Sequence, residues 1–536
     1  MALRAPAIRG PVFFRRYGHL EEKTPAVSMR DITKVFGTIR ANDGVNLDIY
    51  RGEILSLLGE NGSGKTTLMN MLSGIYYPDG GQIYIDGEPV SISSPHEAYS
   101  YGIGMVHQHF KLVDVFTAAQ NIVLGLKEPG GLDLQAASKK IRAICDAYGF
   151  DVDPDQKVYN MSVSQKQTVE IVKVLYRGAD ILILDEPTAV LTPQETDKLF
   201  AVLRNMRNDN KAVIIITHKL HEVMDLSDRV AVLRKGKFIG DVKTSETNAQ
   251  ELTNMMVGHQ VTLNIERPVP ENVHPRIRVE GLTVKGPDGV KKLDKVSFTA
   301  NAGEILGIAG ISGCGQKELL ESIAGLQHAR HGKIYYIGDD GEIDDITGHD
   351  PLEIAAKGVA LSFVPEDRLG MGLVGSMDII DNMMLRSFRK GNSAFTDRKG
   401  PKELAEKVVK ELEVSTPNTT TPVSRLSGGN VQKVLVGREI ASSPTVLLSA
   451  YVVRGLDINS SYTIYDLINK QKKNNVAVIY VGEDLDVLLE LCDRILVLCG
   501  GKVSGIVDHP TPEDKRKVGM MMTKLGGGED DEQQQS

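Results

Sequence analysis

The stretch that decides the fold runs from Arg51 to Thr66 and reads RGEILSLLGENGSGKT. Ile54–Leu58 is an apolar run of strand length, and residues 59–66 fit the phosphate-binding pattern G-x-x-x-x-G-K-[S/T]. Two leucines at helical spacing follow, so the loop joins a buried strand to a helix. Its glycines let backbone N–H groups turn toward phosphate oxygens, and the helix N-terminus adds partial positive charge. Lys65 is expected to reach the β- and γ-phosphates, and the Thr66 hydroxyl to bind Mg²⁺.

A second apolar run ends in two acids. Residues 181–186 read ILILDE, which predicts a buried strand with both carboxylates at its end. Asp185 is expected to hold Mg²⁺, as the acid of this strand does in P-loop nucleotide hydrolases. Glu186 is expected to orient or deprotonate the attacking water.

An internal repeat covers most of the chain. RGEILSLLG at 51–59 returns as AGEILGIAG at 302–310, and Met161-Ser162 aligns with Leu426-Ser427 at a second, constant offset. The period is too long for a solenoid, so the chain holds two copies of one domain. Apolar strand-length runs alternate with helix-like segments in both copies, which predicts an α/β fold with helix-covered parallel sheets. The expected core strands are 54–58, 181–184, 213–216, 305–309, 446–448 and 476–480.

Composition and the proline-rich and polar segments set the expected limits of the domains. The 536 residues carry a formal net charge of −8, which argues against a nucleic-acid partner, and hold no apolar run of membrane-spanning length. A Pro-rich stretch at 267–275 predicts a linker, and the last residues are polar and acidic. We therefore expect a disordered N-terminal extension at 1–27, a first domain at 28–260, a linker at 261–275, a second domain at 276–525 and a disordered acidic tail at 526–536.

The second copy has lost the chemical groups of the first. Gln316 stands where the first copy has Lys65, and Lys317 replaces the magnesium-binding hydroxyl. The two acids at the strand end become Ala450 and Tyr451. Without these groups the charge of a γ-phosphate has little compensation, so no hydrolysis is expected at this loop.

Three further motifs make the chain resemble the ATPases of ABC transporters: MSVSQ at 161–165, DEPT at 185–188, and a histidine, His218, after IIIT. The resemblance implies two tandem P-loop NTPase domains, each with a mostly parallel core sheet, an antiparallel β subdomain and a helical subdomain. It implies that Gln108, in the family's Q-loop, touches Mg²⁺ and the attacking water. It also implies that His218 contacts the γ-phosphate and that Phe36 stacks on adenine.

The signature motif of this family is intact in the second copy, as LSGGN at 426–430, and altered in the first. In the family two such domains pair head to tail, and each ATP is closed by the partner's signature. The resemblance thus implies one complete site, with Asp457 as its D-loop acid. The expected catalytic residues are Glu186, His218, Gln108 and Lys65, and the expected magnesium ligands are Thr66, Gln108 and Asp185. The residues expected to bind ATP are Phe36, Gly59, Asn61, Gly62, Ser63, Gly64, Lys65, Thr66, Thr67, Ser427, Gly428, Gly429 and Asp457.

Fused double domains with a degenerate second copy resemble the ATPase subunit of bacterial simple-sugar and nucleoside importers. The segments at 104–110, 176–195 and 364–368 look most like the nucleoside branch, and ribose or galactose import is the alternative. The implied cofactors are ATP and Mg²⁺. The implied partners are two membrane permeases, an extracytoplasmic substrate-binding protein and possible pairing with a second copy, at the cytoplasmic face of the membrane as a peripheral protein. The rivals are a soluble ABC translation factor, for which two intact sites and a long basic linker are expected, and a regulator that binds ATP without turnover.

Overall fold

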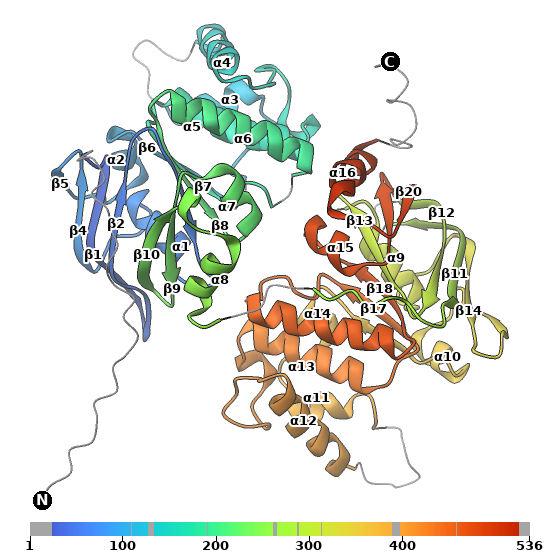
Figure 1. The fold of residues 1–536 in the computed structure, drawn as a ribbon. Coiled ribbons are helices and arrows are strands. Elements are labelled where there is room, and N and C mark those ends of the chain that lie inside the picture. The colour runs from blue at the N-terminus through green and yellow to red at the C-terminus, as the bar shows by residue number, and fades with distance from the viewer. Residues whose placement is uncertain are drawn as a thin grey trace, which may run out of the picture.

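The computed structural model describes residues 24–108, 110–126, 133–189, 191–260, 265–286, 289–311, 313–388, 397–456 and 458–524. Within these ranges the chain forms two domains of the same design, one after the other (Figure 1). The predictions for residues 1–23, for Asp457 and for the tail at 526–536 lie outside the described residues.

Each domain holds one antiparallel sheet and one largely parallel sheet. The first domain orders them β2-β1-β4-β5 and β10-β9-β3-β8-β7-β6, and the second orders them β12-β11-β14-β15 and β20-β19-β13-β18-β17-β16. The strands of the first domain are β1 (Val27–Phe36), β2 (Ile39–Ile49), β3 (Ile54–Leu58), β4 (Gly80–Ile85), β5 (Glu88–Val90), β6 (Ile103–Val106), β7 (Ile181–Asp185), β8 (Ala212–Thr217), β9 (Arg229–Arg234) and β10 (Lys237–Lys243). Those of the second are β11 (His274–Lys285), β12 (Lys291–Ala302), β13 (Ile305–Gly310), β14 (His331–Ile337), β15 (Ile343–Asp345), β16 (Leu361–Val364), β17 (Val446–Ala450), β18 (Ala477–Val481), β19 (Arg494–Cys499) and β20 (Lys502–Asp508).

Helices cover the parallel sheet and build a separate layer beside it. The helices of the first domain are α1 (Lys65–Leu72), α2 (Pro95–Ser100), α3 (Ala118–Val123), α4 (Leu134–Tyr148), α5 (Val163–Tyr176), α6 (Pro193–Asn208), α7 (Leu220–Leu226) and α8 (Ala249–Val257). Those of the second are α9 (Gln316–Ile323), α10 (Pro351–Ala356), α11 (Ile379–Met384), α12 (Lys399–Glu411), α13 (Gly428–Ala441), α14 (Ile458–Lys473), α15 (Leu485–Leu491) and α16 (Lys515–Thr523).

The core strands confirm the prediction from the apolar runs. All residues of β3 and β7 are buried, because helices cover both faces of a parallel sheet. β3 pairs in parallel with β8 and β9, and β13 pairs in the same way with β18 and β19. The six expected strands end within two residues of their predicted limits.

The segment before β11 is fastened to the second domain. Ile265 packs into that domain's core, and the Arg267 guanidinium donates to the carbonyls of Leu489, Cys492 and Pro510 at 3.2, 2.9 and 2.8 Å. The described part of the expected linker therefore moves with the second domain.

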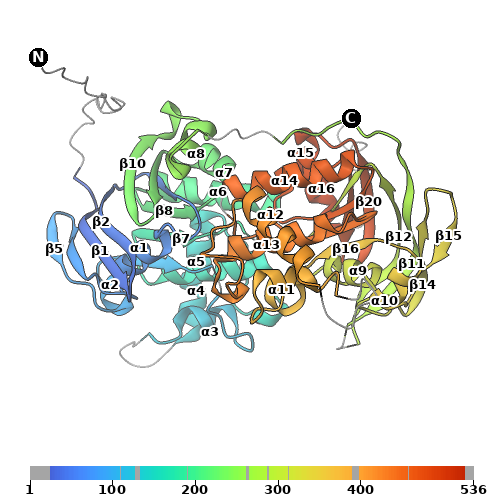
Figure 2. The ribbon, with the colours of Figure 1, turned by 90° about the horizontal axis from the view of Figure 1, so that it is seen from below.

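The two domains also touch each other through two equivalent contacts, α6 with α16 and α14 with the apolar cluster around α8. Gln194 at the start of α6 donates to the Arg516 carbonyl of α16 at 2.9 Å. Ile458, at the start of α14, packs against the apolar cluster formed by α7, α8 and β9 of the first domain. Figure 2 shows the helices of both domains side by side along this contact.

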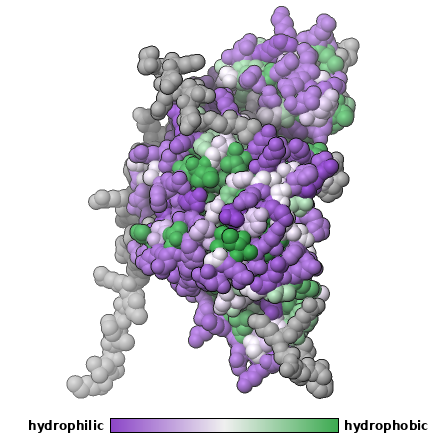
Figure 3. Space-filling model, turned by 90° about the vertical axis from the view of Figure 1, so that its right-hand side faces the viewer, coloured by the Kyte–Doolittle hydropathy of each residue, from purple (hydrophilic) through white to green (hydrophobic). Residues whose placement is uncertain are grey.

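Polar residues dominate the face drawn in Figure 3, where hydrophobic residues form small, separate groups. Within the described residues no helix has both the length and the apolar character that a membrane crossing requires.

An arginine with most of its side chain buried joins the two sheets in each domain. In the first domain the side chain of Arg229 is 8 % exposed and pairs with Glu53 at 2.7 Å and with Asp241. It also donates to the Asp48 carbonyl of β2 at 2.6 Å. Arg494 repeats the arrangement in the second domain, with Glu304 at 3.5 Å and Asp508 at 3.0 Å.

Replacing Arg229 with methionine is expected to lower the free energy of unfolding by about 3–5 kcal/mol, because it leaves two carboxylates without their partner. Arg30→Met is the control. It removes an exposed pair with Asp48 and is expected to cost about 0–1 kcal/mol. Denaturant midpoints of the two variants measure the difference, and equal midpoints would contradict the structural role of Arg229.

Candidate functional site

The phosphate-binding loop of the first domain has the backbone that its glycines allow. Gly62 and Gly64 have φ values of 79° and 97°, in the left-handed region. A Cβ atom at Gly64 would lie 2.3 Å from the Ala41 carbonyl of β2, so no other residue fits there. Lys65, which opens α1, is buried and donates from Nζ to the carbonyls of Gly59 and Glu60 at 2.6 and 3.0 Å.

The groups at this loop suit a phosphate chain. The Ser63 hydroxyl is buried without a hydrogen-bond partner, and no side chain caps the N-terminus of α1 at Gly64. Helix N–H groups and an orphaned hydroxyl are the donors that phosphate oxygens accept from. Of the other predicted contacts, Asn61 is exposed at the rim and Thr67 is half-buried in the first turn of α1.

Thr66 and Asp185 come together as predicted. The Thr66 hydroxyl lies 3.4 Å from the Asp185 carboxylate at the end of β7. No cluster of three or more metal-binding side chains exists in the described part of the chain. Mg²⁺ that arrives with a nucleotide needs one or two protein ligands, since water and phosphate oxygens supply the rest. This pair fits that requirement.

The Glu186 carboxylate is held between two of the other predicted catalytic side chains. Gln108 Nε2 donates to Oε2 at 2.8 Å, and His218 Nδ1 lies 2.9 Å from Oε1. Glu186 has a φ of 46°, an uncommon value for a residue with a side chain. The hydrogen bond to His218 lowers the pKa of Glu186, so this carboxylate is charged at neutral pH.

Burial disfavours the charged forms of Asp185 and Lys65. Burial and the neighbouring charge of Glu186 raise the pKa of Asp185 to about 6. Burial also lowers the pKa of Lys65, although three nearby acids, Glu186, Asp185 and Glu60, oppose this. Without a ligand, the Asp185 carboxylate and the Lys65 ammonium thus keep their charges at a cost in desolvation free energy.

Phe36 ends β1 with its side chain 43 % exposed. Its ring meets the edge of Tyr76 at a centroid distance of 5.3 Å, and Lys34 Nζ lies 5.5 Å from its centre. An exposed aromatic face at this position is available for stacking.

The two signature loops differ at the start of the helix that each precedes. In the first domain the Ser162 hydroxyl accepts from the Gln165 N–H at 3.2 Å and so caps α5. In the second domain Ser427 makes no such bond to α13, and its hydroxyl accepts from Asn430 Nδ2 at 2.8 Å instead. The first N–H groups of α13 therefore stay uncapped by a side chain, beside Gly428 and Gly429.

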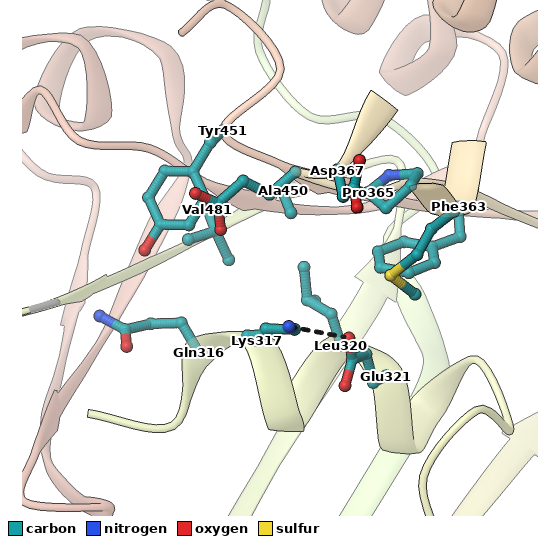
Figure 4. A pocket seen from close by; sticks show the side chains of 12 residues that line it. Gln316, Lys317, Leu320, Glu321, Phe363, Pro365, Asp367, Ala450, Tyr451 and Val481 are labelled. Atoms are coloured by element: carbon teal, nitrogen blue, oxygen red, sulfur yellow. Dashed lines mark ion pairs between the residues drawn. The ribbon is translucent and has the colours of Figure 1, made fainter. Parts of the chain in front are cut away.

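The second phosphate-binding loop keeps the fold of the first without its cations. Gly315 has a φ of 99°, and Gln316 Nε2 donates to the Ile311 carbonyl at 3.1 Å, much as Lys65 does. A cavity of about 380 Å³ lies over this loop. Figure 4 shows Gln316 and Lys317 below Ala450 and Tyr451 in this cavity, with Lys317 paired to Glu321.

Sequence reasoning missed two arginines at this second site, Arg454 and Arg368. Arg454 pairs with Glu366 at 2.5 Å and with Glu483 at 2.9 Å. In the second domain Glu366 and Glu483 stand where the first domain has Gln108 and His218. The charges of these two glutamates were the signal that predicts a cation between them.

Comparison with known proteins agrees with the geometry. The family described as ABC transporter matches residues 42–189 and again 293–449. The chain is 40 % identical over 506 residues to the nucleoside import ATP-binding protein NupA of Lactococcus lactis, covering 94 % of this chain and 98 % of that one. It is 41 % identical over 502 residues to the guanosine import ATP-binding protein NupO of Bacillus subtilis, covering 92 % and 97 %.

A glucose import ATP-binding protein, TsgD13 of Haloferax volcanii, is 39 % identical over 544 residues, which cover 95 % of this chain and 97 % of that one. The archaeal ribosome recycling factor aABCE1, in its complex with the stalk protein aP1, aligns with a TM-score of 0.56 over 87 % of both chains. At 18 % identity this structure shows a common fold alone. The chain belongs to the ABC transporter family.

Asp185→Asn is expected to raise the free energy of unfolding of the ligand-free chain at pH 7.5 by about 1–3 kcal/mol. The folded state keeps a proton on Asp185 up to about pH 6, whereas the unfolded chain loses it near its ordinary value of 3.8. Stability from this group therefore falls as the pH rises from about 4 to 6. At pH 3.5 the gain should vanish.

Asp180→Asn, at the other end of the same strand, is the matched control for Asp185→Asn. Its carboxylate is exposed and pairs with Lys211, so the change is expected to cost up to about 1 kcal/mol. Denaturant unfolding at the two pH values measures both variants. A loss of stability in Asp185→Asn at pH 7.5 would show that the carboxylate is not strained.

Proposed function

We propose that the chain is the ATP-hydrolysing subunit of an ABC importer and energises the uptake of nucleosides through partner permeases. The observation that carries the ATPase is the set of Lys65, Asp185, Glu186 and His218 around one glycine-built loop. The substrate rests on the relatives, of which two that are 40–41 % identical carry nucleoside and guanosine import in their names.

The residues of the first domain have separate roles in ATP binding and hydrolysis. The loop from Gly59 to Thr67 holds the phosphates by its N–H groups and Lys65, with Phe36 against the base. Thr66, Asp185 and Gln108 would hold Mg²⁺, which offsets the phosphate charge. Glu186 is the general base, and the hydrogen bond to His218 keeps it charged. Gln108 and His218, which both bond to Glu186 here, gain new partners when nucleotide enters.

The complete site needs the second domain as well. Ser427 precedes α13, and Gly428 and Gly429 are the first two residues of that helix, whose terminus has no side-chain cap. These donors would close on the γ-phosphate held by the first loop. Asp457 would serve the same site. The signature of the first domain has its serine already engaged with Gln165, and it would face a loop that has Gln316 in place of the phosphate-binding lysine. Hydrolysis therefore takes place at one of the two sites.

Partner permeases fit the surface that follows each Q-loop position. Large hydrophobic side chains stand exposed there in both domains, as expected for a protein-binding surface. They are Val113, Val115 and Leu124 in the first domain and Leu369, Met371, Val374 and Met377 in the second. Docked there at the cytoplasmic face of the membrane, the chain would drive two permeases. An extracytoplasmic binding protein would deliver the substrate to these permeases.

Sugar import is the second candidate, because the glucose import relative is 39 % identical over most of both chains. A soluble translation factor has less support. The recycling factor shares 18 % identity, and the second loop lacks the lysine and the acids that two working sites require.

Uptake by cells whose own gene is replaced by variants of this chain tests the proposal. Wild type is expected to import labelled nucleoside, and unlabelled glucose or ribose in excess should not compete. Glu186→Gln should reduce uptake at least tenfold, because loss of a general base slows hydrolysis about 10²–10⁴-fold.

Tyr451→Phe is the matched control for Glu186→Gln, since Tyr451 holds the corresponding place in the second domain. Its uptake should equal that of wild type. Import of labelled glucose in place of nucleoside would favour the sugar branch, and wild-type uptake by Glu186→Gln would refute the assignment of the base.

A further inference from the structure

A three-residue ion network crosses the second, degenerate site. The Arg454 guanidinium donates from Nη1 to Glu366 at 2.5 Å and from Nε to Glu483 at 2.9 Å. Glu366 stands at the Q-loop position, directly after β16, and Glu483 stands after β18. One cation thus ties together the two loops that flank the place of the γ-phosphate.

The first site has a comparable arrangement with the opposite charge at its centre, although Arg454 stands three residues after Tyr451, the counterpart of Glu186. There the anion Glu186 lies in the centre, between Gln108 and His218. In the second site the cation Arg454 lies in the centre, between two glutamates. The backbones agree, since Glu186 and Tyr451 both have φ near 50° and both donate their N–H to the end of the next strand, at 2.9 and 2.8 Å.

The charges around the second cavity do not suit a nucleotide. Its lining holds Glu321, Glu366 and Asp367 but a single lysine, Lys317, which already pairs with Glu321 at 3.8 Å. Arg454 is committed to Glu366 and Glu483. A triphosphate would bring further negative charge to a place where carboxylates outnumber the free cations.

A second arginine connects this network to the intact signature loop. Arg368 Nη1 donates to the Gly428 carbonyl at 3.1 Å, and its Nη2 donates to the Arg454 carbonyl. A Cβ atom at Gly428 would approach Arg368 Nη1 to 3.2 Å, so a larger residue would crowd this contact. The first domain has Val163 at the corresponding signature position and Phe110 in place of Arg368.

Asp367, which lies between Glu366 and Arg368 in the sequence, fixes the backbone that carries these two residues. Its carboxylate accepts from the Gly370 N–H at 2.7 Å and caps a short π-helical turn from Arg368 to Gly372. Each side chain of Glu366, Asp367 and Arg368 thus holds a different part of the degenerate site.

Glu483 also interacts electrostatically with the first domain. Burial raises the pKa of Glu483, and the charges of Arg454, Lys219 and His218 oppose that rise. Lys219 and His218 follow β8 of the first domain, at its own γ-phosphate position. The network thus contacts the intact signature loop of the second domain, and its Glu483 interacts electrostatically with charges beside the catalytic histidine of the first.

We propose that Arg454 replaces nucleotide in the degenerate site: it bridges Glu366 and Glu483 permanently and, through Arg368, positions the signature loop that closes the catalytic site. Arg454 and Arg368 are positioning residues, because they touch other protein groups and not the reacting atoms. The inference rests on the proposed ATPase function and adds that the second site works without a ligand.

The test measures ATP hydrolysis and ATP binding by the full chain. Arg454→Ala is expected to lower kcat at least tenfold, because the main-chain carbonyl of residue 454, to which Arg368 donates, is no longer held in place by the ion pairs with Glu366 and Glu483. The Kd of ATP at the first loop, measured by equilibrium dialysis with radiolabelled ATP, should change less than twofold. Glu366→Gln in the Arg454→Ala background should add no further loss, since both residues act through one network.

Arg142→Ala is the matched control, since Arg142 is 58 % exposed and pairs with Asp153 and Asp155, much as Arg454 is 55 % exposed and pairs with two acids. Its kcat should equal that of wild type. Thermal unfolding of each variant checks that the fold is retained. If Arg454→Ala does not fold, Arg368→Met replaces it and should show the same split between kcat and Kd.

Two results would overturn the proposal. One is wild-type kcat in a folded Arg454→Ala variant. The other is binding of two ATP molecules per wild-type chain, which would show that the second site takes a nucleotide; loss of one of them in Arg454→Ala would make Arg454 a phosphate ligand. Failure of the ATPase function itself is separate, since it appears as equal hydrolysis by wild type and Lys65→Ala.

Discussion

The negative charge of a triphosphate has to be met by cations and N–H groups wherever a protein binds it, and the two halves of this chain differ in how they meet it. The first domain offers Lys65, a strained Asp185 and an uncapped helix terminus. The second keeps the loop and helix but balances its charges internally through Arg454. The first domain thus offers cations and N–H groups to a ligand, whereas the second pairs its own cation with two carboxylates.

The backbone is the constant part of this design. The glycines that end the two phosphate-binding loops have φ values of 97° and 99°, and the strands of the two core sheets follow the same order. Arg229, which is buried, and Arg494, which is 19 % exposed, join the sheets in the same way. A fold held by packing and buried ion pairs away from the site leaves the site residues free to change their chemistry.

Much of the fold and of the first site could be predicted from the sequence. The apolar runs at Ile54–Leu58 and Ile181–Asp185 predicted buried strands because only a fully covered sheet tolerates them. The spacing of the loop placed Lys65 and Thr66, and the structure brings Thr66 next to Asp185. Family resemblance was needed for Gln108 and His218, since a single residue in a loop carries no local signal.

The rest depended on contacts between distant segments, which no local pattern encodes. Arg454 and Arg368 meet Glu366, Glu483 and Gly428 only after four segments of the second domain assemble. The fastening of the linker by Arg267 is of the same kind, because its partners lie more than 200 residues away. The different capping of Ser162 and Ser427 depends on the third residue of each helix, Gln165 or Asn430, and on its rotamer.

The central claim is that one of the two phosphate-binding loops hydrolyses ATP and the other does not. Trapping of a photoreactive ATP analogue with Mg²⁺ and vanadate, followed by mass spectrometry of the labelled peptides, tests it most directly. The account predicts one trapped nucleotide per chain, attached near residues 36–72 of the first domain. Two nucleotides per chain, or label on the peptide that contains residues 310–323, would contradict it.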